Sequence, residues 1–173
     1  MNFPKNTERG FTLIELLVVI AIIGILSSTV LATLGKSRAQ ARDAYRKTAM
    51  KQLEVALELY KEANGTYPIA TDGLWWGTNG NGGNHDTTGS NGYIPNLAPT
   101  YIPELPKDPA GQNPTGWSGF YYRSPNGSQY KLIIHKNGST GPESFPTLGQ
   151  KFYDPTRPTS AWMICEGALG CAW

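Results

Sequence analysis

Apolar residues are concentrated near the start of the chain. The run 16–34 contains no charged residue, and the wider run 11–34 contains only Glu15. A helix rises 1.5 Å per residue, so these 24 residues span about 36 Å, which exceeds the roughly 30 Å of a hydrocarbon core. The pattern predicts a membrane-spanning segment at 11–34 behind a short polar leader at 1–10.

Beyond residue 34 the apolar residues recur every three or four positions, which is the period of an amphipathic helix. There is no proline between Pro4 and Pro68, and Asn64 and Gly65 provide a C-terminal stop. We therefore predict one helix from about residue 11 to about residue 63, with an amphipathic half at 35–64. Its predicted apolar stripe comprises Tyr45, Ala49, Leu53, Ala56, Leu57, Tyr60 and Ala63.

The remainder, 65–173, combines turn residues with short β-forming stretches. The Gly/Asn-rich stretch 77–92 is typical of an exposed loop. Runs at 119–123 and 129–135 flank a turn and predict a hairpin, and a third strand is expected near 161–165. The fold class expected is α+β, with a long N-terminal helix packed on a small antiparallel sheet.

The sequence contains no recognisable catalytic or metal-binding pattern. There is no Gly-x-Ser-x-Gly, no phosphate loop, and His85 and His135 are far apart. A net charge of +2 also argues against a dedicated nucleic-acid binder. We expect no enzyme activity, no bound metal and no cofactor.

Three interpretations of the N-terminus differ in how they treat Glu15. A secretory signal peptide cleaved after 30–32 conflicts with the length of the apolar run and with an acid inside it. A plain membrane anchor explains the length but neither Glu15 nor the junction between Gly10 and Phe11. The third interpretation takes Glu15 as functional.

Residues 9–26, RGFTLIELLVVIAIIGIL, resemble the N-terminus of type IV pilins and of the related pseudopilins of type II secretion. The resemblance implies that a prepilin peptidase cuts after Gly10 and that Phe11 is N-methylated. It also implies that Glu15 directs filament assembly by pairing with the N-terminal amine of a neighbouring subunit. The fold implied is a pilin-like lollipop, and the partners implied are related pilin subunits, the peptidase, an inner-membrane assembly platform and, before assembly, membrane lipid.

Two features of the apolar half keep alternatives open. Pairing of Glu15 with an amine on Phe11 would satisfy two charges that are each expensive in lipid, but Glu15 could instead reach the membrane interface. Gly24 is a candidate for the partial unwinding that pilin helices undergo in filaments. Simple tolerance of glycine in a membrane helix explains it equally well.

A basic run follows the apolar segment. By the positive-inside count it would place the C-terminal part in the cytoplasm, whereas the resemblance implies a single-pass precursor with its N-terminus in the cytoplasm. We follow the resemblance. The run could bind anionic head groups, acidic neighbours or DNA, or could be a solvated face. It comprises Lys36, Arg38, Arg42, Arg46, Lys47 and Lys51, against the single acid Asp43.

The C-terminal part carries mixed family signals. The string LPKDPAG at 105–111 resembles the LPxDPWGxPY segment of major pseudopilins, with Ala110 in place of Trp. Those proteins hold calcium in an acidic loop, but the corresponding stretch 136–149 offers only Glu143. Cys165 and Cys171 are a candidate disulfide of a kind common among type IV pilins, although two free thiols remain an alternative.

Taken together, these residues favour the structural subunit of a type IV pilus-like filament at the cell surface. The cysteine pair and the poor calcium loop favour a pilin, while the Asp108–Pro109 segment favours the alternative, a major pseudopilin of type II secretion. A third alternative is a membrane-tethered minor adhesin or DNA-binding tip subunit. Exposure of Trp75, Trp76 and Trp117 would favour that third alternative, and burial would count against it.

Overall fold

The computed structural model describes residues 10–70, 73–78, 85–111, 117–137, 141–147 and 149–173. Apart from Gly10, the predicted leader lies outside these residues, as does 79–84 of the predicted loop. The chain forms two compact units, Met1–Ala39 and Gln40–Trp173. The elements in chain order are α1 (Leu13–Asn64), β1 (Trp76–Gly77), β2 (Gly119–Arg123), β3 (Tyr130–His135), β4 (Ala161–Glu166) and α2 (Ala168–Ala172).

Within the described residues, the first unit comprises 10–12 and the part of α1 up to Ala39, most of which is apolar. Among the described residues, α1 is the one helix long and apolar enough to cross a membrane, and its apolar window is not buried against the rest of the chain. The hydroxyls of Ser28, Thr29, Thr33 and Ser37 donate to backbone carbonyls three or four residues earlier. These polar groups are therefore satisfied without water, as a lipid environment requires.

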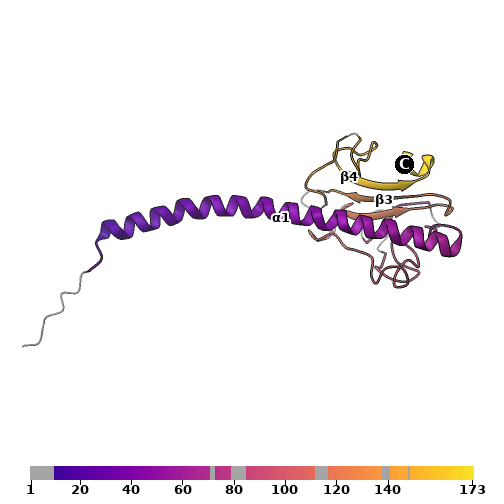
Figure 1. Cartoon of the computed structure of the whole chain (residues 1–173), viewed down its shortest axis with the longest axis horizontal. Helices are drawn as coiled ribbons and strands as arrows, with labels where there is room; N and C mark the ends of the chain where they lie inside the picture. Colours follow the sequence, from indigo (N-terminus) through magenta and orange to yellow (C-terminus); the bar gives the residue numbers. More distant parts are fainter. Residues whose placement is uncertain (1–9, 71–72, 79–84, 112–116, 138–140, 148) are drawn as a thin grey trace, which may run out of the picture. The chain divides into compact units, whose positions relative to one another are not determined.

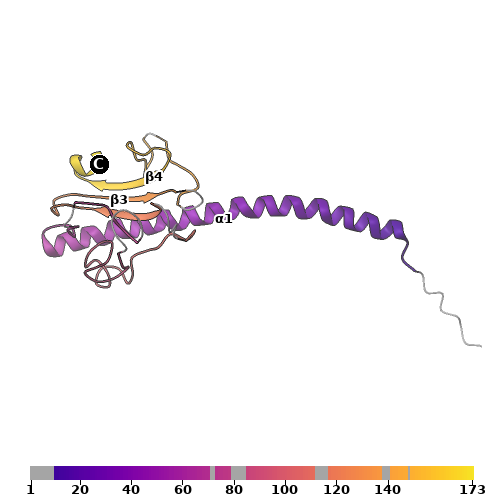
Figure 2. The same cartoon turned by 180° about the vertical axis from the view of Figure 1, so that it is seen from behind.

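The second unit is built on a four-stranded antiparallel sheet in the order β1-β2-β3-β4. Figures 1 and 2 show β3 and β4 beside the C-terminal part of α1 from two sides. The three strands expected from the sequence are present within one or two residues of their predicted bounds. With a long helix and this small sheet, the predicted α+β class is confirmed.

A single apolar cluster joins the helix to one face of the sheet. From α1 it takes residues spaced by three or four, namely Ala49, Met50, Leu53, Ala56 and Leu57. From the sheet it takes three residues in register, Phe120, Ile134 and Trp162, and three more, Tyr122, Leu132 and Ile164. The other face is covered as well, because Tyr121 and Ile133 pack with Trp75 and Ala161 in a second cluster.

The predicted stripe is correct at its centre and wrong at both ends. Tyr45 is 46% exposed, and Ala63 is also exposed. One position along, Arg46 is fully buried instead. Because 3.6 residues make a turn, position 46 lies on the same face as Ala49, Met50 and Leu53, whereas position 45 lies beside it.

Candidate assembly site

The junction between Gly10 and Phe11 is open. Both residues precede α1, Phe11 is 86% exposed, and a Cβ placed on Gly10 would meet nothing within 4 Å. The chain's own packing therefore does not require glycine at position 10. If glycine is required at position 10, the requirement comes from an enzyme that binds this segment.

Thr12 and Glu15 form a capping box at the N-terminus of α1. The Thr12 backbone N–H and its hydroxyl both donate to Oε2 of Glu15, at 2.9 and 2.8 Å. The Glu15 N–H donates in return to Oγ1 of Thr12 at 3.3 Å. This reciprocal pattern satisfies two of the N–H groups that a helix start leaves unpaired.

The capping box fixes the Glu15 carboxylate at the helix end next to Phe11. Within the part of the chain that the structure describes, Oε1 of Glu15 accepts no hydrogen bond, so one carboxylate oxygen is available to an ammonium. Pairing with the Phe11 amine of a neighbouring subunit remains a prediction. The role of Thr12 was missed, although the Thr-x-x-Glu spacing is a sequence signal of a capping box.

Gly24 lies within the regular part of α1, and a Cβ there would meet nothing within 4 Å. The helix is continuous at this position in the isolated subunit. Unwinding in a filament stays a prediction.

The basic run is not one solvated stripe, because Arg46 points into the core of the second unit. Its guanidinium donates to both carboxylate oxygens of Asp108, at 2.8 and 2.7 Å, and to Asp43 at 2.9 Å. Burial alone would lower the pKa of Arg46, but the two carboxylates outweigh it and raise that pKa. Asp108 of the pseudopilin-like string therefore ties its loop to α1 through a bidentate pair.

Asp43 extends this network to 136–149, the stretch that corresponds to the calcium loop of major pseudopilins but contains only one acid, Glu143. The two carboxylate oxygens of Asp43 accept hydrogen bonds from the backbone N–H groups of Glu143 and Ser144, each at 3.0 Å, and from the Ser144 hydroxyl at 2.7 Å. Arg42 pairs with Glu143 at 2.6 Å. Side chains of α1 thus fasten this loop, and among the described residues no cluster of three metal-ligating side chains occurs.

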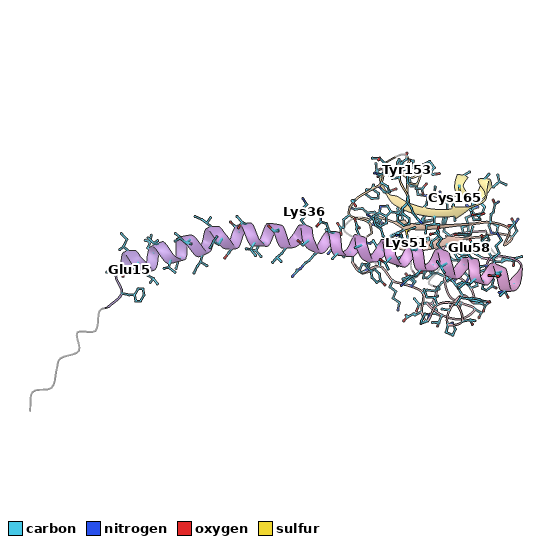
Figure 3. All side chains as sticks on the ribbon, in the orientation of Figure 1. Glu15, Lys36, Lys51, Glu58, Tyr153 and Cys165 are labelled. Atoms are coloured by element: carbon cyan, nitrogen blue, oxygen red, sulfur yellow. A yellow bond between two sulfur atoms is a disulfide. The ribbon has the colours of Figure 1, made fainter. Side chains whose placement is uncertain are left out.

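The candidate cysteine pair forms a disulfide in the structure, with an S–S distance of 2.01 Å between Cys165 and Cys171. It joins β4 to α2, and Cys165 is labelled in Figure 3. Trp173, two residues after Cys171, is held in place as well. The buried Lys131 ammonium donates to the Trp173 backbone oxygen at 2.6 Å and to Asp154 at 3.1 Å. Burial lowers the pKa of Lys131, and Asp154 opposes that shift.

The three tryptophans that would mark an adhesive surface each pack against neighbouring side chains, but only Trp75 is buried. Trp75 is 7% exposed, Trp76 stacks on His85 with ring centroids 4.0 Å apart, and Trp117 packs beside Tyr121 at 5.3 Å. The burial of Trp75 counts against the minor adhesin or DNA-binding tip subunit, whereas Trp76 and Trp117 remain partly exposed.

Comparison with known proteins identifies the family. Residues 5–31 match the family model of the prokaryotic N-terminal methylation motif. Type II secretion system core protein G of Dickeya chrysanthemi is 32% identical over 172 residues, covering 95% of this chain and 92% of that protein. The namesake from Vibrio cholerae serotype O1 is 33% identical over 140 residues, covering 79% and 84%. The chain belongs to the core protein G family of pseudopilins. No solved structure gave a significant match.

Membership of the core protein G family confirms the predicted resemblance to pilins and pseudopilins. The family is one of structural subunits, which confirms that the chain is not an enzyme. The preference for a pilus subunit over a pseudopilin is not supported, since the relatives carry the name of the alternative. That preference rested partly on the missing acidic loop, and in this chain the carboxylate of Asp43 accepts hydrogen bonds from the backbone of that loop.

Proposed function

We propose that the chain is a structural subunit of the pseudopilus of a type II secretion system. The observation that carries this proposal is the similarity to core protein G over 95% of the chain, which includes the C-terminal part as well as the N-terminal motif. Asp108, in the pseudopilin-like string, supports it further because its buried pair with Arg46 gives that string a structural role.

In this proposal the precursor inserts α1 in the inner membrane with its leader in the cytoplasm. A prepilin peptidase cleaves after Gly10 and methylates Phe11, and an inner-membrane platform moves the subunit into the filament. The open Gly10–Phe11 junction suits enzyme access. The C-terminal unit lies outside the cytoplasm, where oxidation of Cys165 and Cys171 is favoured.

Glu15 directs the register of assembly. An unpaired carboxylate or ammonium inside a lipid-facing bundle has a high free energy, and a close ion pair lowers it. The capping box holds the Glu15 carboxylate at the helix end, so a neighbouring amine meets an oriented acceptor. Subunits that dock out of register leave both charges unpaired.

Deleting the gene for this chain in its own organism tests the proposal. We expect secreted proteins to disappear from the medium, and to return on expression of the wild-type chain or of Glu8→Gln, whose changed residue is removed with the leader. Glu15→Gln should fail to restore secretion. Normal secretion in the deletion strain together with loss of surface pili would instead assign the chain to a type IV pilus.

A further inference from the structure

Lys36 and Arg38 differ from Arg42 and Arg46 in the pairing of their charges, and from Lys47 and Lys51 in belonging to the first unit. Arg42 and Arg46 are bound to carboxylates within the second unit. Lys36 and Arg38 belong to the first unit, are exposed, and form no ion pair with any residue that the structure describes. Figure 3 shows the Lys36 side chain projecting away from the helix.

Within the described part of the first unit, Glu15 is the sole acid that could neutralise these two cations. It lies 21 positions before Lys36, which is about 31 Å along a helix. At that distance an exposed pair is screened almost completely at physiological salt. Any partner of these two cations other than water therefore comes from outside the first unit.

The positions of these residues along α1 match the surface of a bilayer. The uncharged run ends at Leu34, so Lys36 and Arg38 follow it by about 3 and 6 Å along the helix axis. When the apolar segment spans a membrane, both Cα atoms lie at the level of the head groups, and long basic side chains reach phosphate from there.

Their angular separation favours a lipid partner over a protein partner. Residues two positions apart are rotated by about 200° around a helix, so Lys36 and Arg38 point to opposite sides. A protein docked on one face of α1 would engage one of them, whereas a lipid leaflet surrounds the helix. We propose that Lys36 and Arg38 bind the phosphates of anionic phospholipids in the leaflet beyond the C-terminal end of the apolar segment.

This contact has a consequence for the order of events. Both residues follow the Gly10 cleavage site, so processing leaves the contact intact, and the subunit must release these lipids when it leaves the membrane. The ammonium of Lys36 acts as a point charge, and the guanidinium of Arg38 can hold a phosphate through two hydrogen bonds. The inference rests on membrane insertion of α1 and not on the secretion role.

The test uses the full uncleaved chain in detergent micelles doped with phosphatidylglycerol or phosphatidylcholine, with bound lipid counted by native mass spectrometry. We expect the wild type to retain phosphatidylglycerol preferentially. Lys36→Gln with Arg38→Gln should weaken that retention by roughly 30-fold, on the scale of charge attraction at an anionic membrane surface. Lys36→Arg with Arg38→Lys should keep it.

The matched control is Lys51→Gln with Lys107→Gln, which removes the same charge from exposed sites in the second unit. This control should retain lipid like the wild type. Equal retention of both lipids by the wild type, an unchanged Lys36/Arg38 double variant, or an equal loss in the control would each overturn the proposal. Because no filament is needed, these results are independent of the secretion assay.

Discussion

Lys131 and Asp154 form an ion pair at 3.1 Å in which both side chains are completely buried. Lys131 lies in β3 between β2 and β4, and Arg157 contributes a second cation to Asp154 at 3.3 Å. Each charge of this pair depends on the other, because a single charge buried away from water would be strongly disfavoured. The pair connects the sheet to the end of the chain through the Trp173 oxygen.

Lys131→Met is expected to destabilise the second unit by about 3–5 kcal/mol, since it removes the fully buried partner of Asp154 and leaves that buried carboxylate with the partly exposed Arg157 alone. Thermal unfolding of the full chain in mild detergent, followed by near-ultraviolet circular dichroism, measures the effect. Lys107→Met is the control, because its pair with Glu104 is exposed, and it should leave the transition almost unchanged. Equal transitions for the two variants would contradict the buried pair.

Asp43→Asn should destabilise the second unit by about 3 kcal/mol. It removes one of the two carboxylates that neutralise Arg46, and the new amide group places an N–H donor opposite the N–H groups of the loop. Calcium should not restore stability, and a chelator should leave the melting temperature of the wild type unchanged. Glu54→Gln, which loses an exposed pair with Lys151, is the matched control. A wild-type melting temperature that rises with calcium would show that this loop still depends on metal.

Alkaline pH should unfold the second unit. Burial raises the pKa of five tyrosines above 10.0, that of Tyr121 to about 12. Above pH 10 the unfolded chain loses these protons while the folded chain keeps them, so the free energy of unfolding falls as pH rises. The lowered pKa of Lys131 acts in the opposite direction, but it is one group against five. The five are Tyr67, Tyr93, Tyr121, Tyr122 and Tyr130.

Denaturant titrations from about pH 8 to about pH 11 measure this dependence, with phenolate absorbance as the probe of ionisation. The expected result is a stability that is level at the low end and declines steeply above about pH 10. The other four of the nine tyrosines are exposed or partly exposed. A phenolate absorbance before unfolding that exceeds the contribution of four tyrosines would show that the five are not buried.

Cys165→Ser with Cys171→Ser is expected to lower the stability of the second unit by about 2 kcal/mol, the loop-entropy value for so short a loop. The loss should be matched by adding a reductant to the wild type, and the double variant should not respond to reductant. A wild type insensitive to reductant under denaturing conditions would mean that the cysteines are not joined.

Thr12→Val should impair assembly while leaving cleavage after Gly10 intact, because it removes the hydroxyl that donates to Glu15 and accepts from its N–H. Thr12→Ser keeps both hydrogen bonds and is the control. The yield of filaments sheared from cells, compared with the amount of processed subunit in the membrane, separates the two steps. Normal filament yield from Thr12→Val would show that the capping box is dispensable.

The sequence predicted the parts of this fold that depend on local periodicity. The helix, the central stripe residues such as Leu53 and Leu57, and the three long strands each repeat a pattern over several residues. The two-residue strand β1 and the short helix α2 are too brief for such a pattern. Arg46 was interpreted as a surface residue because its partner Asp108 lies 62 positions away, and only the folded chain brings the two together.

The candidate site divides in the same way. Gly10, Phe11 and Glu15 were identified from a contiguous motif, and Thr12 could have been identified from its spacing to Glu15. The attachment of the 141–145 loop to Asp43 could not have been predicted from the sequence, because it depends on backbone N–H groups about a hundred residues away.

Intact mass and N-terminal peptide analysis of the subunit recovered from filaments tests the central claim most directly. The account predicts a mature chain that starts at Phe11 and carries one added methyl group. A chain that begins after Ala32, or one that retains Met1 in the membrane, would contradict it and leave Glu15 without a role.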